Sequence, residues 1–296
     1  MPATLRLASL SMTRVAPFEI NGVLYPRSPV VIAVAHAGRH YPQGLIDMAR
    51  VPIKALQGLE DRHADALIGT AAREGATTIV VSLARAAIDM NRDPREIDPA
   101  MVEDVRPGRA LLQTQKVRGG LGLIPRRLAS CGELWHRRLS EDELDRRIAE
   151  VHHPYHQAVA DALEAARAVY GGAILIDCHS MPTLPARSGA RPQIVLGDRF
   201  GKSASPAIIH DALEVLKRHD IPHGRNQPYA GGYTLERHGQ PARGVHAVQI
   251  EFDRALYMGD DGEPVVEAVS RCSRLLADLS LTLGGRLGRD TLIAAE

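Results

Sequence analysis

The sequence predicts an α/β protein built around a mostly parallel sheet. Short apolar runs rich in Val and Ile recur along the 296 residues and alternate with longer amphipathic stretches. This alternation is expected when buried strands are joined by helices that cross back over one sheet. Hydrophobic residues make up 45% of the chain and aromatic residues only 4%, so the core must consist mainly of aliphatic side chains. Such a mixture is typical of helices packed on a buried sheet.

Five apolar segments are predicted to form strands of this sheet. They span residues 30–35, 77–83, 173–176, 193–196 and 245–252. Continuous apolar runs with many β-branched residues are typical of strands that are buried on both faces. We therefore expect these segments to lie inside the molecule, between layers of helices.

Amphipathic segments predict helices at residues 61–73, at 140–170, from 206 onwards and at 265–283. Ser140 and Glu143 have the spacing of a capping box, and Pro206 suits the first turn of a helix that starts after Ser205. Pro154 is expected to divide the second segment into two helices or to bend it sharply, because proline lacks an N–H donor and crowds the preceding turn. The last helix should cover the sheet.

Two segments are predicted to be loops. Residues 106–125 are predicted to form a long loop. Residues 226–233 are predicted to form a mobile loop that carries Tyr233. The glycines of the second loop would serve as a hinge or simply turn the chain. The run Gly119-Gly120-Leu121-Gly122 does not predict a phosphate site, because no strong strand precedes it and no Lys-Ser or Lys-Thr follows.

Composition excludes several classes of partner. The formal net charge is +1 and no run of five or six like charges occurs, which argues against nucleic acid. No stretch approaches the ~18 apolar residues needed to cross a bilayer, and the N-terminus has no sustained apolar region, so we expect a cytoplasmic protein with no membrane partner. For this length we expect one domain over residues 1–296. The sequence does not determine whether the protein forms a homo-oligomer.

Cysteine usage restricts the kinds of metal site. The three cysteines, Cys131, Cys178 and Cys272, lie far apart and show no CxxC spacing. Neither a disulfide framework nor a cysteine-rich zinc site is therefore indicated. A metal, if present, has to be bound by histidines and carboxylates.

Two predicted strands run directly into residues of the kind that bind metals. His36 follows the first strand, and Asp177 and His179 follow the strand at 173–176. Ligand sites of open α/β sheets gather at the carboxyl ends of strands. Residues i and i+2 of a strand share a face, so Asp177 and His179 act either as two ligands or as one ligand and a carboxylate that orients it. Cys178 points the opposite way, which argues against a catalytic pair with His179.

Further acidic residues are candidates for the same site. Glu251 lies within an apolar strand, where an unpaired carboxylate is costly. A general base beside a metal and a structural salt bridge both explain it. Asp61 and Asp65 are four residues apart and share a face of the predicted helix, so either completes a site with the two histidines. Acidic residues also favour helix starts for electrostatic reasons alone.

The sequence Asp89-Met90-Asn91-Arg92 places an amide beside a guanidinium. The planar guanidinium of arginine can donate to both oxygens of a carboxylate. Asn91 and Arg92 are therefore candidates for binding a substrate carboxylate, with a solvent-exposed loop arginine as the alternative interpretation.

Together these segments resemble the N-formylglutamate amidohydrolases, also called N-formylglutamate deformylases, of the histidine utilisation pathway. The resemblance runs from about His36 to Met258 and depends on the order and spacing of short stretches. The matching stretches are His36-Ala37-Gly38 with Tyr41-Pro42, then Asp61 with His63, Asp65 and Leu67, then Ile88 to Arg92, His153-Pro154-Tyr155-His156, Asp177-Cys178-His179-Ser180, Gly231-Gly232-Tyr233, Gln249-Ile250-Glu251 and Tyr257-Met258.

The resemblance implies a fold similar to that of zinc carboxypeptidases and aspartoacylases, with a central mixed, mostly parallel sheet in a three-layer α/β/α arrangement. It implies that His36 and His179 are ligands of one Zn²⁺ or another divalent metal, and that Asp61 or Asp65 is the acidic ligand. Glu251 matches the catalytic glutamate that activates water. Asn91 and Arg92 match the pair that binds a substrate carboxylate, and Tyr233 lies on a loop near the substrate.

The sequence departs from these families at two positions. Arg39 stands where the carboxypeptidases carry the glutamate of a His-x-x-Glu ligand pair. Glu236 stands where the deformylases usually have an arginine, with Arg237 one residue later. The activity implied is metal-dependent hydrolysis of an N-acyl amino acid, with N-formyl-L-glutamate as the expected small-molecule substrate. The alternatives are a carboxypeptidase or other deacylase, and a catalytically silent protein that binds a metal or ligand.

Overall fold

The structure, a computed structural model, describes residues 15–22, 26–185 and 191–293. Its centre is a seven-stranded sheet with the order β1-β3-β2-β6-β9-β7-β8. The pairs β2–β3, β2–β6, β6–β9 and β7–β8 are parallel, whereas β1–β3 and β7–β9 are antiparallel. The strands are β1 (Phe18–Asn21), β2 (Val30–Val34), β3 (Thr77–Val81), β6 (Ala173–Met181), β7 (Ile194–Gly197), β8 (His223–Arg225) and β9 (Val245–Asp253). A separate small sheet pairs β4 (Arg127–Leu128) with β5 (Gly132–Glu133).

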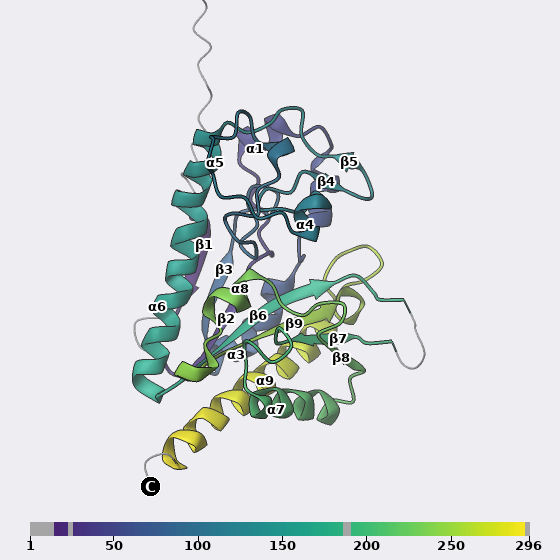
Figure 1. The fold of residues 1–296 in the computed structure, drawn as a ribbon. Coiled ribbons are helices and arrows are strands. Elements are labelled where there is room, and N and C mark those ends of the chain that lie inside the picture. The colour runs from purple at the N-terminus through teal and green to yellow at the C-terminus, as the bar shows by residue number, and fades with distance from the viewer. Residues whose placement is uncertain (1–14, 23–25, 186–190, 294–296) are drawn as a thin grey trace, which may run out of the picture.

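Helices cover both faces of the large sheet, so the predicted three-layer α/β/α fold is confirmed. Figure 1 shows α6 along one side of the sheet, and α7 and α9 packed together on the other. The helices are α1 (Gln43–Met48), α2 (Ile53–Leu56), α3 (Gly69–Arg73), α4 (Gln115–Arg118), α5 (Glu141–Arg147), α6 (His153–Tyr170), α7 (Pro206–Arg218), α8 (Tyr233–His238) and α9 (Val266–Ile293). None of them, in the described part of the chain, combines the length and apolar character that crossing a bilayer requires.

The central strands β2, β6 and β9 bury both of their faces. On β6, Leu175 contributes to a hydrophobic cluster that also contains residues of α5 and α6, while Ile174, Ile176 and Cys178 contribute to a second cluster with residues of α7 and α9. Successive side chains of a strand point to opposite faces. Asp177 and His179 therefore lie on the α6 side of the sheet, and Cys178 packs on the other side, as predicted.

The strands that carry the polar candidates are longer than predicted. β6 continues through Asp177 and His179 to Met181, and β9 continues to Asp253, with every residue of both strands buried. The sequence signal for a strand fades where polar residues begin, because hydrophobicity was the evidence for it. Pairing with the neighbouring strand keeps these polar residues in the sheet, since the parallel register joins His179 to Glu251. The short edge strands β1 and β8 were not predicted.

The predicted helix at residues 61–73 is wrong in its first half. His63 adopts a left-handed conformation with φ of 60°, followed by a 3-10 helix at Ala64–Ile68 and the short α3. The peptide N–H of Asp61 donates to the carbonyl of His36 at 2.9 Å, which ties this residue to the end of β2 instead of to a helix. Asp61 and Asp65 consequently do not share a helical face.

The helical segment with Pro154 continues without the predicted division. α5 is capped by Ser140, whose hydroxyl accepts from the N–H of Glu143 at 3.2 Å, as the capping-box spacing predicted. Between α5 and α6 lies a π-helical turn, Ile148–His152. Pro154 then occupies the first turn of α6, where the missing N–H costs little. A change of helical pitch thus accommodates the proline.

Other predicted elements are confirmed with altered limits. α7 starts at Pro206 with Ser205 as its cap, and α9 extends ten residues beyond the predicted end at 283. The 106–125 loop contains one helical turn, α4. The predicted loop at 226–233 ends earlier than expected, because Tyr233 is the first residue of α8.

Candidate active site

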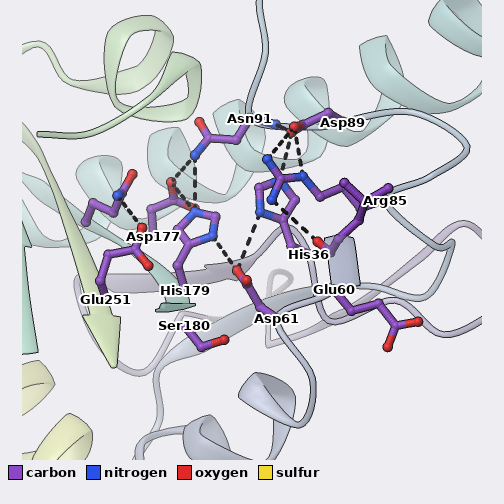
Figure 2. Close-up of polar contacts among 12 residues, drawn as sticks. His36, Glu60, Asp61, Arg85, Asp89, Asn91, Asp177, His179, Ser180 and Glu251 are labelled. Carbon is purple, nitrogen blue, oxygen red and sulfur yellow. Dashed lines mark hydrogen bonds and ion pairs between the residues drawn. The ribbon is translucent and has the colours of Figure 1, made fainter. Parts of the chain in front are cut away.

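The carboxyl ends of three adjacent strands bring the candidate residues together. β6 lies between β2 and β9 in the sheet. His36 follows β2, His179 lies near the end of β6, and Glu251 lies opposite it on β9. Figure 2 shows these side chains on one side of the sheet with Asp61 between the two imidazoles.

His36, Asp61 and His179 form a compact group whose nitrogen and oxygen atoms lie within 4.8 Å of one another. Asp61 Oδ2 is 2.8 Å from Nδ1 of His179 and 3.5 Å from Nδ1 of His36. Each of the three residues is only 3% exposed. Among the described residues, this is the group of histidine, cysteine and acidic side chains with the spacing of a metal site.

Two contacts hold Asp61 in this position. Besides the hydrogen bond from its N–H to His36, the guanidinium of Arg254 donates to the carbonyl of Glu60 at 2.6 Å and lies 3.5 Å from Asp61 Oδ1. Arg254 follows β9 and also donates to Ser180 Oγ at 3.1 Å. The loop that carries Asp61 is thereby attached to the ends of β2, β6 and β9.

The outer nitrogens of both histidines are bound by carboxylates. His36 Nε2 lies 2.7 Å from Asp89 Oδ1, and His179 Nε2 lies 3.0 Å from Asp177 Oδ2. When each Nε2 donates to its carboxylate, the Nδ1 of a neutral imidazole has a lone pair on the side of Asp61, whereas a protonated imidazole donates from Nδ1 to the Asp61 carboxylate. Such an arrangement needs positive charge between these atoms, supplied by protons or by a cation. Carboxylates that orient metal-binding histidines in this way are usual in zinc sites.

The charges of this cluster shift several pKa values. Burial alone would lower the pKa of His179, but the carboxylates of Asp177 and Asp61 outweigh it and raise the pKa well above the usual histidine value. Burial would raise the pKa of Asp61, yet hydrogen bonds with His179 and His36 hold it well below the usual value. Asp61 is therefore a carboxylate in the folded protein, which suits a metal ligand.

Glu251 lies beside this group on β9 and has a different environment. Its pKa is raised to about 8, mainly by burial and also by the charges of Asp61 and Asp177, against the opposing charge of His179. Gln249, two residues earlier on the same face, donates from Nε2 to Glu251 Oε1 at 2.8 Å. A carboxyl group with a raised pKa beside a candidate metal site has the properties of a general acid and base.

Asn91 connects the candidate site to α8. Its side-chain nitrogen donates to Asp177 Oδ2 at 3.3 Å and lies 3.2 Å from His179 Nε2, and its Oδ1 accepts from the N–H of Thr234 at 2.9 Å. Arg92 donates from Nε to the carbonyl of Leu121 and from Nη1 to that of Asn91. These bonds fix the guanidinium and leave Nη2 without a described hydrogen bond.

Three buried histidines hold the chain around Asn91 and Arg92 from the α6 side. His156 donates from Nε2 to the carbonyl of Met90, and His152 donates from Nε2 to that of Arg92, both at 2.9 Å. His238 of α8 donates to His156 Nδ1 at 3.0 Å. The sequence stretch His153 to His156 was part of the resemblance, but the pattern did not indicate which residues it would contact.

Two predicted site residues lie outside the central group. The Asp65 carboxylate accepts two hydrogen bonds from Arg39, at 3.1 Å and 2.6 Å, and is partly exposed. Tyr233 begins α8, where its ring contacts His156 with centroids 5.0 Å apart and its hydroxyl accepts from Arg237 at 3.1 Å. The structure therefore brings Asp61, and not Asp65, to the two histidines.

Sequence reasoning missed Asp89 and Arg85. Arg85 binds Asp89 Oδ2 through Nε at 2.9 Å and Nη2 at 2.7 Å. Burial would raise the pKa of Asp89, but the charges of Arg85, His36 and Arg92 hold it well below the usual value. The i, i+4 spacing of Arg85 and Asp89 was available as a signal for an ion pair, although it does not indicate that His36 lies on the other side of the carboxylate.

A family model for N-formylglutamate amidohydrolase matches residues 28–258 of this sequence. The chain belongs to the N-formylglutamate amidohydrolase family. It is thus an amidohydrolase by family, and the predicted family resemblance is confirmed. The matched region contains every candidate residue discussed above, from His36 to Glu251.

Relatives in this family cover most of the chain. An N-formylglutamate deformylase from Pseudomonas aeruginosa is 29% identical over 243 residues, which cover 79% of this chain and 84% of the relative. One from Pseudomonas putida is 28% identical over 243 residues, with 80% and 84% covered. The crystal structure of an N-formylglutamate amidohydrolase from Ralstonia eutropha JMP134 has 31% identity and a TM-score of 0.85, and the match covers 93% of this chain and 100% of that one. A protein from Agrobacterium tumefaciens, with 17% identity and a TM-score of 0.67, shares the fold.

Proposed function

We propose that this protein hydrolyses the amide bond of N-formyl-L-glutamate and releases formate and L-glutamate, as a step of histidine degradation in the cytoplasm. The proposal assigns the activity to one domain of residues 1–296. The observation that carries it is the buried group of His36, Asp61 and His179, with Glu251 beside it. The names of the Pseudomonas and Ralstonia relatives support the choice of substrate.

The three ligand residues fit a zinc ion. Two imidazole nitrogens and one carboxylate oxygen form a donor set typical of catalytic zinc sites, in which three protein ligands are usual. As neutral imidazoles, both histidines direct lone pairs towards Asp61, and their outer nitrogens are bound by Asp89 and Asp177. When bound, Zn²⁺ or another divalent metal would supply Lewis-acid polarisation of the formyl carbonyl and acidify a water molecule.

Glu251 is the residue that we propose to move protons during the reaction. Its carboxylate takes a proton from the attacking water while the water oxygen bonds to the formyl carbon. It then gives this proton to the amide nitrogen as the carbon–nitrogen bond breaks. This role requires the carboxylate form, and a divalent cation beside Glu251 would lower its pKa from the value of about 8 that burial produces.

Asn91 and Arg92 would bind a carboxylate of the substrate. Arg92 is held by the carbonyls of Leu121 and Asn91, so its remaining N–H groups keep a fixed direction. Asn91 adjoins His179 and α8 and places the bound substrate beside the proposed metal site. Tyr233, at the start of α8, would border the same space. Binding holds the amide in position before the reaction begins. The loss of translational and rotational entropy then occurs on binding and does not add to the reaction barrier.

The test combines metal analysis with an assay of formate release. We expect purified protein to contain about one zinc or other divalent ion per chain, to release formate from N-formyl-L-glutamate, and to lose this activity on chelation. Glu251→Gln should keep the metal and lose activity by about a thousand-fold or more. Full activity of this variant would remove Glu251 from the mechanism.

A panel of substrates separates the alternatives. Faster hydrolysis of peptides than of N-formyl-L-glutamate would indicate a carboxypeptidase, and faster hydrolysis of N-acetyl or longer N-acyl amino acids another deacylase. Bound metal without turnover of any of these compounds would indicate a catalytically silent homologue.

A further inference from the structure

Lys116 lies close to the candidate site although it belongs to the 106–125 excursion. It is part of α4, where its neighbour Val117 is buried in the fold. The carbonyl of Lys116 accepts from the N–H of Leu121 at 2.8 Å, and the carbonyl of Leu121 accepts from Arg92 Nε at 2.9 Å. Two hydrogen bonds therefore connect the backbone of Lys116 to the guanidinium proposed to bind substrate.

The segment after α4 is fixed along its length against the Asp89–Glu96 chain. Leu123 donates to the carbonyl of Glu96 at 2.7 Å and accepts from the N–H of Asp89 at 2.8 Å. Between them, Gly122 approaches so closely that an added Cβ would lie 2.6 Å from the Glu96 carbonyl oxygen. The position of α4 relative to the site is thus set by backbone contacts and not by a free loop.

The charges of the candidate site act on the amino group of Lys116. Lys116 is an exposed residue, yet desolvation lowers the pKa of its amino group, and the positive charges of Arg92 and Arg85 lower this pKa further. Asp89 and Glu251 oppose this effect. These effects agree with the backbone hydrogen bonds through Leu121, which place α4 next to the segment that carries Arg92.

Among the described residues, no carboxylate forms an ion pair with Lys116. Arg85 is paired with Asp89 at 2.7 Å, and Arg92 Nε lies 3.5 Å from Glu96 Oε2. In the described part of the chain, Lys116 has no hydrogen-bonding or ion-pair partner for its amino group. An unpaired ammonium group on the segment that also holds the Arg92 guanidinium adds a second positive charge to this region, which favours a ligand with more than one negative charge.

We propose that Lys116 binds the side-chain carboxylate of the substrate, while Asn91 and Arg92 bind its α-carboxylate, and that Lys116 thereby selects N-acyl amino acids with a second carboxylate. This assignment rests on the function proposed above. It makes Lys116 a specificity-determining residue, since an uncharged side chain on the substrate would leave the ammonium group without a partner.

The test compares two formylated substrates of nearly equal size, N-formyl-L-glutamate and N-formyl-L-glutamine, which differ in the charge at one end. Lys116→Met should lower kcat/KM for N-formyl-L-glutamate by about 10- to 100-fold and change that for N-formyl-L-glutamine by less than about three-fold. Lys116→Arg should restore most of the preference because it restores the charge. Arg118→Met is the matched control, since Arg118 lies on the same helical turn and donates to the carbonyl of Gln113; both rates should stay unchanged.

Equal losses on both substrates in Lys116→Met would overturn the assignment. A selective loss in Arg237→Met, with Lys116→Met unaffected, would transfer the role to α8 and overturn it as well. Wild-type protein that hydrolyses neither compound would instead contradict the proposed function. Calorimetric titration of N-formyl-L-glutamate into Glu251→Gln, with and without Lys116→Met, then still tests the Lys116 contact, because it requires no turnover. Equal affinities in that titration would count against it.

Discussion

Asp61 and Asp65 are close in sequence but have different surroundings. Asp61 is buried between two imidazoles, and Asp65 is partly exposed and paired with Arg39. The left-handed conformation of His63 turns the chain between them. A partly exposed ion pair contributes little to stability, about 1 kcal/mol at most, so the two aspartates should respond differently to the loss of their charge.

Asp61→Asn should lower metal affinity by more than about 100-fold, because it removes a charged ligand from a buried site. Asp65→Asn should leave metal content unchanged. Elemental analysis after dialysis against a weak chelator measures both. Equal metal contents in the two variants would contradict the assignment of Asp61.

Asp177 has no place in the metal group itself, yet it fixes the ring of His179 through Nε2. Asp177→Asn keeps the size of the side chain and removes its charge. We expect metal affinity to fall by about 10- to 100-fold, as is usual when a carboxylate behind a metal-binding histidine is lost. Competition with a fluorescent chelator gives the dissociation constant. A constant equal to that of Asp65→Asn would exclude this orienting role.

α6 acts as the support of the segment that carries Asn91 and Arg92. His152 and His156 lie one helical turn apart, and each donates to a carbonyl on either side of Asn91. The π-helical turn that ends at His152 sets the start of α6, and with it the direction of both rings. Because the imidazoles are neutral, each can donate one proton and accept another, which allows His238 to bind His156 from α8.

His156→Leu should raise KM for N-formyl-L-glutamate by about 10-fold, because the buried carbonyl of Met90 loses its donor and the Asn91 segment loses its support. His156→Gln, which can still donate, should restore part of the affinity. His153→Leu is the control, since His153 is exposed on the same helix. Steady-state kinetics at saturating metal measures the effect. Loss of stability with an unchanged KM would show that His156 serves folding only.

The whole molecule has one hydrophobic cluster on each face of the large sheet. Buried polar residues, including three histidines, lie between the strand ends and α6. Burial lowers the pKa of His152 to about 4, of His156 to about 2 and of His238 to about 3. These side chains have a usual pKa of 6.5 and regain it on unfolding. The unfolded chain therefore binds protons below pH 6.5 that the folded chain does not bind.

The free energy of unfolding should accordingly fall as the pH drops from 6.5 towards 4, by about 1.4 kcal/mol per pH unit for each of these histidines. The raised pKa of His179 adds stability that is already complete below pH 6.5, so it does not offset this slope. Glu251, with a pKa of about 8 when folded and 4.5 when free, keeps a proton that the unfolded chain releases, and it offsets about one of the three histidine contributions down to about pH 4.5. Urea unfolding of the chelated protein at pH 7, 6 and 5 measures the effect. His156→Leu should remove one of the three histidine contributions, about 1.4 kcal/mol per pH unit. If the free energy of unfolding does not fall between pH 7 and pH 5, these histidines are protonated in the folded state.

Much of the fold followed from local patterns. Apolar runs predicted five of the seven strands of the large sheet, and capping residues predicted two helix starts, because burial on both faces and capping restrict the neighbouring residue types. The path between Asp61 and Arg73, the pitch change before Pro154 and the start of α8 at Tyr233 were not predicted. Each of these depends on contacts with distant parts of the chain, such as the hydrogen bond from Asp61 to His36.

The candidate site, like the fold, could be predicted from the sequence only in part. Polar residues after apolar strands were enough to indicate His36 and His179 as candidates, since parallel strands end at one edge of the sheet. The pattern singled out Glu251 as an acidic residue within an apolar strand, and the family resemblance supplied its expected role. Only the folded chain distinguished Asp61 from Asp65, placed Asp89 behind His36, and connected the backbone of Lys116 through Leu121 to Arg92. These relations join residues on loops whose paths are decided by packing, and sequence spacing carries no record of such contacts.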